Sequence, residues 1–337
     1  MAIFSLFYIA YIVFYQKKEM ISDQYGNKVI VDLSYIKDYL LNVFINNPEN
    51  ILYLLAIIIL TLFNWGSEVL KWKILIGKLV KIDTKIAIRS ILGGVAASNI
   101  TPFRVGGFFA RVAHLPFRHR IRGIAILSIG DIAQLTTTIL MGSASLFMLL
   151  YFREDDFTIL DFKKSTMMAC NVVAFFGTLV FCFIFMHLKS FALFLDKIPA
   201  LQKVKKIWSV VAKLDHKKTV IQLLGISTFR LVVILLQYYL VFQLFGLSID
   251  VTESMLITGA LLMLYNFLPT LNILEMGLTR TGIFLVLLSM FLSPDLVTIS
   301  LTLVLTCSLF VIWLVNLVLP AVFGSYYLLK IKLFNHK

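Results

Sequence analysis

The feature that most constrains the fold is a series of long, nearly uncharged apolar runs. Most of them approach or exceed the roughly 18 to 20 apolar residues that a helix needs to cross about 30 Å of hydrocarbon. Hydrophobic residues make up 60% of the chain and charged residues 15%, whereas about a quarter of a soluble domain is charged. The sequence therefore predicts an all-α polytopic membrane protein. Its expected spans are residues 2–15, 50–72, 121–151, 166–187, 219–246 and 297–328.

The net charge of +13 is concentrated in short segments beside these runs. Lys and Arg are dense at 71–122, at 188–218 and in the C-terminal tail, whereas 153–164 also carries acidic residues. Under the positive-inside rule the basic segments face the cytoplasm. We therefore expect a multi-pass protein of a bacterial inner membrane with both termini in the cytoplasm. Its positive charge should meet anionic lipid headgroups, and we expect no nucleic acid partner.

Two further apolar stretches, at about 86–113 and 254–292, are interrupted by glycine, proline and charge. The expected orientation places both ends of each stretch on one side of the membrane, and each is too short for two comfortable spans. We therefore predict two re-entrant hairpins of broken helix, inserted from opposite faces, as an inverted repeat produces. The repeat would divide one integral membrane domain, 1–337, into halves at about 1–152 and 166–330. The alternative is two glycine-rich loops packed against neighbouring helices.

The first hairpin combines a helix break with two arginines. Its notable residues are Thr101, Pro102, Arg104, Gly106, Gly107 and Arg111. The residue before a proline is driven out of the α region, so a helix should end there. A helix that restarts at the glycines offers free N–H groups and a positive dipole end, and the two arginines can share a face. We predict a phosphate cradle; the alternative is an interfacial loop that touches lipid phosphates nonspecifically.

The second hairpin repeats this order of features. Pro269 is followed by a polar break, then by Glu275 and Arg280 near the start of the next apolar arm. A charged residue between apolar arms is expensive in a membrane and usually functional. We therefore include Pro269, Glu275 and Arg280 in the predicted site.

Three more ionisable residues lie inside the predicted spans: Asp131, Arg230 and, near the end of its span, Glu68. Gln237 follows Arg230 by seven residues and shares its helix face. A lone charge at the bilayer centre costs roughly 2.5–3.5 kcal/mol on insertion scales, so these groups must face one another or water. We expect Arg230 to pair with Asp131 or Glu275. The alternative is a buried pair that only orients helices.

The remaining candidate residue types predict no chemistry. The three cysteines lie in apolar stretches without CxxC spacing, and no histidine has a carboxylate or thiol at ligand spacing. We therefore expect no metal and no cofactor. Trp72 suits the interfacial aromatic belt, and Trp65 needs no special role.

Several motifs together resemble a known family, the flippase-like membrane domain named after lysylphosphatidylglycerol synthase. They are Asn64-Trp65-Gly66-Ser67-Glu68, Lys71-Trp72-Lys73, and Ser98-Asn99-Ile100-Thr101-Pro102 with Gly106 and Arg111. Pro269 and Glu275-Met276-Gly277-Leu278-Thr279-Arg280 are similar to its second signature, and Asp131 falls where the family carries an acidic residue. The resemblance covers nearly the whole chain. This chain departs from it at Gly107, where many members have glutamate, and in lacking a Pro-Gly-Gly run.

The resemblance implies movement of a lipid or lipid-linked group between leaflets, without the aminoacyltransferase activity of bifunctional members. We expect a flippase or transporter rather than an enzyme, acting on an anionic or aminoacylated phospholipid, with a homo-oligomer or a separate lipid-modifying enzyme as partner. The predicted headgroup-binding residues are Arg104, Gly106, Gly107, Arg111, Asp131, Arg230, Gln237, Glu275 and Arg280. The predicted supporting residues are Asn64, Glu68, Trp72, Thr101, Pro102 and Pro269. The alternatives are an integral membrane lipid-modifying transferase and a non-catalytic membrane partner subunit.

Overall fold

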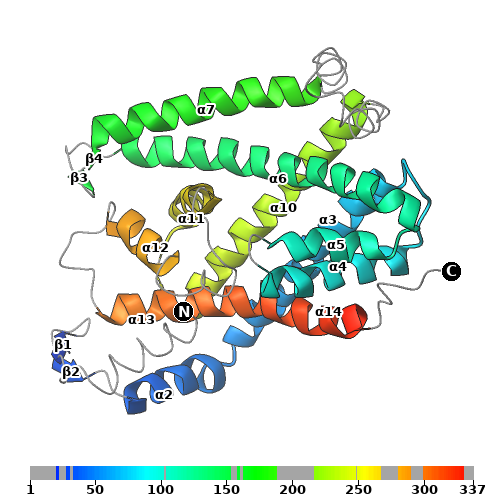
Figure 1. Ribbon diagram of the computed structural model, residues 1–337. Coiled ribbons are helices and arrows are strands. Elements are labelled where there is room, and N and C mark those ends of the chain that lie inside the picture. The colour runs from blue at the N-terminus through cyan, green and yellow to red at the C-terminus, as the bar shows by residue number, and fades with distance from the viewer. Residues whose placement is uncertain are drawn as a thin grey trace.

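The protein is an all-α membrane helix bundle (Figure 1). The structure, a computed structural model, describes residues 20–22, 28–30, 33–101, 104–152, 158–159, 162–187, 216–247, 249–266, 280–289 and 299–329. The predicted first span, 2–15, lies outside these residues.

Five helical segments among the described residues are long and apolar enough to cross a membrane, and they match the other predicted spans. They are α3 (Asn50–Ile76), α6 (Phe117–Tyr151), α7 (Lys164–Met186), α10 (His216–Leu244), and the continuous run of α13 (Ile299–Trp313), η6 (Leu314–Val318) and α14 (Leu319–Leu329). Large apolar side chains such as Leu52, Leu55 and Ile59 are exposed along α3. Lipid is as apolar as these side chains, so their exposure carries no cost in a bilayer.

Each region predicted as a hairpin contains two helices that pack against each other. The first consists of α4 (Thr84–Ile100) and α5 (Val105–Ala113), which pack against each other. The second consists of α11 (Val251–Asn266) and α12 (Arg280–Ser289), also in contact. The connection 267–279 lies outside the described residues. The first helix ends at Thr101, whose backbone is extended (φ −112°, ψ 139°), as expected for a residue before proline.

Contacts between the two halves of the chain occur in matching pairs. In the first half α3, the α4–α5 hairpin and α6 follow one another, and in the second half α10, the α11–α12 hairpin and α13–α14 do so. Helix α3 packs on α10, α4 packs on α14, and α11 packs on α6. When the two halves are exchanged, the α4–α14 contact becomes the α11–α6 contact, and the α3–α10 contact is unchanged. This is the contact pattern of a two-fold related pair.

Glycines mark the two equivalent contacts. A Cβ on Gly324 of α14 would meet the Leu92 carbonyl and Ala96 of α4, and one on Gly142 of α6 would meet the Gly259 carbonyl and Met263 of α11. The contacted positions are the ninth and thirteenth residues of α4 and of α11 alike. Small residues let the backbones of membrane helices approach closely, so the two halves use the same device at the same register.

The remaining elements are short. Helices α2 (Leu33–Leu41) and η1 (Asn42–Asn46) precede α3. Strand β1 (Met20–Ser22) pairs antiparallel with β2 (Lys28–Ile30), and β3 (Thr158–Ile159) pairs with β4 (Phe162–Lys163) in the turn between α6 and α7. Helix α10 contacts α3, α6, α7, α11 and α13, so it lies at the centre of the bundle (Figure 1).

Candidate functional site

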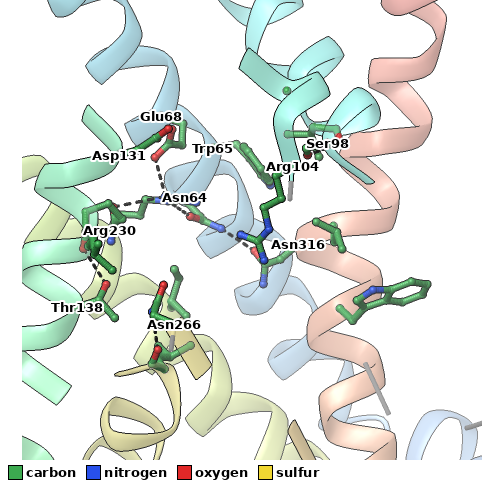
Figure 2. Close-up of a pocket in the computed structure, with 18 of the residues that line it drawn as sticks. Asn64, Trp65, Glu68, Ser98, Arg104, Asp131, Thr138, Arg230, Asn266 and Asn316 are labelled. Atoms are coloured by element: carbon green, nitrogen blue, oxygen red, sulfur yellow. Dashed lines mark hydrogen bonds and ion pairs between the residues drawn. The ribbon is translucent and has the colours of Figure 1, made fainter. Parts of the chain in front are cut away.

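A cavity of about 460 Å³ lies inside the bundle, between α3, the first hairpin, α6, α10, α11 and η6. Its charged lining residues are three arginines and two carboxylates: Glu68, Arg104, Arg111, Asp131 and Arg230. Its polar lining residues include Asn64, Ser98, Gln134, Thr138, Asn266 and Asn316. Figure 2 shows side chains from both halves of the chain around this space, among them Glu68, Arg104, Asp131, Arg230 and Asn316. Cations outnumber anions on the lining, so the cavity is suited to an anionic group.

Glu68 is the centre of a buried ion cluster. Its Oε1 lies 2.6 Å from Lys71 Nζ and 2.6 Å from Arg230 Nη1, and the Glu68 side chain is 7% exposed. Lys71 lies three residues after Glu68 on the same helix face and also donates to Gln134 Oε1 at 3.1 Å. A buried carboxylate is tolerated when cations and hydrogen bonds satisfy it. Glu68 and Arg230 therefore join α3 to α10 where the two halves of the chain meet.

Arg230 is held by several further partners. Its Nε donates to Asn64 Oδ1 at 2.6 Å, and its guanidinium lies 5.8 Å from the centre of the Trp65 ring. Asn64 donates to Asn316 Oδ1 at 2.8 Å, and Asn316 donates in turn to Gln237 Oε1 at 3.1 Å. Fully connected polar networks rigidify a buried site. This network fixes the geometry of Arg230 on the cavity wall.

Arg111 is held much more loosely. Its Nη1 lies 3.8 Å from Asp131 Oδ1 and 4.0 Å from Glu68 Oε2. These separations give Coulombic attraction but are too long for hydrogen bonds. Its Nε is buried and has no hydrogen-bond partner among the described residues. Among the described residues, Arg111 is therefore held by charge attraction rather than by hydrogen bonds.

Arg104 is aimed into the cavity by an unusual backbone. It has φ 59° and ψ 16°, and it is the one non-glycine residue with positive φ in the described part of the chain. Its Nη2 donates to the Tyr265 hydroxyl of α11 at 3.2 Å, so it links the two hairpins. Strained backbone of this kind costs of order 1–3 kcal/mol and clusters at functional sites.

Thr101 holds the break next to Arg104. Its hydroxyl donates to the Ala97 carbonyl at 2.8 Å and accepts the Gly106 N–H at 2.9 Å. A Cβ on Gly106 would collide with Thr101, so the close approach requires glycine. The hairpin therefore differs in detail from the phosphate cradle that the sequence predicts. The second helix begins at Val105 rather than at the glycines, and the Gly106 N–H is used within the hairpin.

Asn316 lies in η6, a π-helical turn between α13 and α14. Single π-turns inside α-helices are frequent at functional sites. Here the turn places an amide on the cavity wall within an otherwise apolar run, and Asn64 and Gln237 satisfy its hydrogen bonds.

The structure brings many of the predicted residues together. Arg104, Gly107, Arg111, Asp131 and Arg230 line the cavity, with Asn64 and Glu68. Thr101 and Gly106 shape the hairpin behind it. Gln237 is buried and bonds Ile57, Thr61 and Asn316, so it supports the wall. Pro102, Pro269 and Glu275 lie outside the described residues, as does the side chain of Arg280, the first residue of α12.

Several details of the sequence interpretation were wrong. Arg230 pairs with Glu68, and the ion pair of Asp131 is with Arg111; the alternative partner Glu275 lies outside the described residues. Trp72 is 1% exposed and packs between α3, α4, α5 and α6, so it is not an interfacial anchor. Trp65, for which the sequence predicted no special role, lines the cavity, and the Arg230 guanidinium lies 5.8 Å from the centre of its ring.

Sequence reasoning also missed Lys71, Gln134, Tyr265 and Asn316. Lys71 was counted as a loop cation, yet α3 extends to Ile76 and buries it. The spacing of Glu68 and Lys71 was the available signal, because residues three apart share a helix face. For Asn316 the signal was an amide within an apolar run.

A cavity with buried arginines and carboxylates inside an apolar bundle defines a class of protein. Its members are multi-pass membrane proteins with polar and charged side chains at membrane depth. Residues 49–315 match the model of the family described as the lysylphosphatidylglycerol synthase TM region, and the chain belongs to this family. Searches of curated proteins and of solved structures each gave no match. The family and the apolar helices together identify a lipid-related membrane protein.

Proposed function

We propose that this protein moves a phospholipid or lipid-linked group between leaflets by admitting its charged headgroup to the cavity. The observation that carries the proposal is the cluster of three arginines and two carboxylates around about 460 Å³ of space inside an apolar bundle. A phosphate meets the excess of positive charge. An amine on an aminoacylated lipid meets Asp131, whose side chain is 44% exposed.

The arginines divide the work. Arg230 is bound to Glu68 and Asn64 at 2.6 Å, so it contributes a fixed positive field. Arg111 has only long ion pairs, at 3.8 and 4.0 Å, among the described residues, so its donors serve the headgroup phosphate. Guanidinium is well suited to this role because its fork of donors matches phosphate oxygens.

The two hairpins are re-entrant in this proposal and belong to an inverted repeat. If each candidate span crosses once, α6, α7 and α10 follow α3, and α3 and α10 run in opposite directions. The two-fold contact pattern then has its axis in the membrane plane. Repeats of this type in transporters expose a midplane site alternately to the two sides. The basic segments lie in the cytoplasm and the protein lies in a bacterial inner membrane.

In this proposal the protein makes and breaks no covalent bond. A separate lipid-modifying enzyme supplies any aminoacylated substrate, and the headgroup is anionic or aminoacylated. The transported lipid is thus the molecule whose headgroup the cavity binds.

The test is a transport assay in liposomes with headgroup-labelled phosphatidylglycerol, its lysyl ester or phosphatidylethanolamine. We expect purified protein to speed the movement of label between leaflets, and Arg111→Gln to slow it at least tenfold, since a charge-assisted contact is worth about 1.5–3 kcal/mol. Arg122→Gln is the matched control, because Arg122 is exposed and lies outside the cavity. It should transport as the wild type does.

Stability separates transport from folding in this test. Arg111→Gln leaves Glu68 with Lys71 and Arg230, so the variant should remain monodisperse in detergent. Transport no faster than in empty liposomes, for all three lipids and with folded protein, would overturn the proposal.

A further inference from the structure

An apolar groove of about 670 Å³ runs along the outside of the bundle between α3, α4, η6 and α14. Its walls are apolar side chains such as Ile58, Leu62, Val69, Leu92 and Phe323. Lys73 and Thr84 line one end, where Lys73 Nζ donates to the Thr84 hydroxyl at 2.7 Å. The groove therefore has an apolar length and a cationic end.

The groove and the charged cavity share one wall. Trp65 lines both, while the neighbouring positions of α3 divide, with Asn64 and Glu68 on the cavity and Gly66 and Val69 on the groove. Helix η6 divides in the same way, with Val315 on the groove and Asn316 on the cavity. A single layer of side chains thus separates an ionic space from an apolar one.

Packing rather than hydrogen bonding holds this partition. The Trp65 Nε1 has no hydrogen-bond partner among the described residues. The Arg230 guanidinium lies 5.8 Å from the centre of the Trp65 ring. A buried indole without a partner for its N–H is uncommon. The ring can turn without breaking a hydrogen bond to the described residues.

We propose that the groove holds an acyl chain of the same lipid whose headgroup enters the cavity, with Trp65 at the junction of headgroup and tail. The inference rests on the proposed function and adds to it a binding place for an acyl chain of the transported lipid. The two spaces have the chemistry of the two parts of such a molecule, and they meet at one residue.

The dimensions fit this assignment. Counted from Trp65, the helix rises about 10 Å to Ile58 and about 12 Å to Lys73, at about 1.5 Å per residue, and half of the hydrocarbon core is about 15 Å thick. On either side of this junction the groove therefore holds most of the length of one leaflet's acyl chain. Membrane lipid already solvates an acyl chain, so the groove provides orientation and register rather than hydrophobic affinity.

Gly66 offers a way to close the groove. A Cβ there would meet no atom within 4 Å, so Gly66→Phe fills the groove without a backbone collision. Gly177 of α7 is the matched control, because its Cβ would also meet no atom within 4 Å and it lies away from the groove. Both changes replace an exposed helical glycine by the same residue.

The experiment measures tryptophan fluorescence of the whole protein in detergent, titrated with phosphatidylglycerol that carries bromine on its acyl chains. Bromine quenches an indole that it contacts. The contribution of Trp65 is the difference between the wild type and Trp65→Phe. We expect that contribution to be quenched in the wild type and in Gly177→Phe, and the quenching to be lost in Gly66→Phe. Glycerophosphoglycerol, which has the headgroup without chains, should compete for the cavity without quenching Trp65.

An unquenched Trp65 contribution in the wild type overturns the inference, as does equal quenching in Gly66→Phe and Gly177→Phe. The measurement on the wild type does not depend on whether Gly66→Phe folds. Transport with an unquenched Trp65 would contradict the inference and leave the proposed function intact. Quenching of Trp65 without transport would support the acyl-chain groove and contradict the proposed function.

Discussion

At the scale of single residues, the cavity contains two kinds of arginine. Arg230 is joined to Glu68 by a short, charge-assisted hydrogen bond of 2.6 Å, whereas Arg111 faces its carboxylates across 3.8 and 4.0 Å. Short ionic hydrogen bonds inside a bundle hold structure, and removing one partner leaves the other charge buried. The same side chain type therefore supports the fold at one position and, in the proposed function, serves a ligand at the other.

Replacing Glu68 tests the structural role. We expect Glu68→Gln to lower stability by about 3–5 kcal/mol, because Arg230 and Lys71 are left buried without their anion. Thermal unfolding in detergent measures this loss. The double variant Glu68→Gln/Arg230→Gln should recover part of it, because the uncompensated cation is gone. Losses that simply add in the double variant would show that the two residues are not coupled.

At the scale of elements, each hairpin is held by a glycine contact with a spanning helix of the other half. Gly324 faces the Leu92 carbonyl and Gly142 faces the Gly259 carbonyl. A carbonyl in a helix cannot move aside as a side chain can, so these contacts set how closely each hairpin docks.

Alanine substitutions test this docking. Gly142→Ala and Gly324→Ala should each destabilise the protein by about 1–3 kcal/mol through overpacking. Gly177→Ala, where a Cβ meets no atom within 4 Å, should be neutral or stabilising by up to about 1 kcal/mol, because alanine favours helix. Thermal unfolding of the three variants distinguishes them, and equal midpoints would contradict the prediction.

The connection between α5 and α6 should give the fold a pH dependence. Burial, and then the nearby Arg89 guanidinium, lower the pKa of His114 from its usual 6.5. The folded state therefore disfavours protonated His114, and stability should fall as pH decreases from about 6.5 toward the folded pKa. Unfolding midpoints of wild type and His114→Gln between pH 7.5 and 5 measure this, with pH values chosen around the ordinary pKa. Parallel curves would contradict it.

Elements were predictable from sequence where the signal is local. A long apolar run predicts a span through its length alone, and Thr101-Pro102 predicts a helix end through local sterics. The partner of Arg230 was not predictable, because Glu68 is 162 residues away and their contact depends on how α3 crosses α10. The left-handed backbone of Arg104 likewise follows from tertiary contacts, since isolated arginine avoids that region.

At the scale of the whole molecule, the paired contacts relate its two halves by a two-fold exchange. If each candidate span between α3 and α10 crosses the membrane once, the two-fold axis lies in the membrane plane. In the proposed topology the loop after α3 is cytoplasmic and the β3–β4 turn lies on the opposite side. The distribution of Lys and Arg along the sequence predicted this topology. The matching positions at which the two halves contact each other were visible only in the structure.

Cysteine labelling tests that topology. In a variant without Cys170, Cys182 and Cys307, we introduce Lys78→Cys after α3 or Lys163→Cys in β4, both exposed positions. A membrane-impermeant maleimide added to spheroplasts should label Lys163→Cys at once and Lys78→Cys only after permeabilisation. Labelling of both from the same side would exclude an odd number of crossings between them.

The π-helical turn at Leu314–Val318 also sets the phase of the last helix. Each residue of an α-helix advances the side-chain direction by about 100°, since there are about 3.6 residues per turn. The wider turn absorbs additional chain between α13 and α14. The turn therefore changes the direction in which later side chains of the same span point. Asn316 can face the cavity and Gly324 can face α4, which an unbroken α-helix would not allow at the same time.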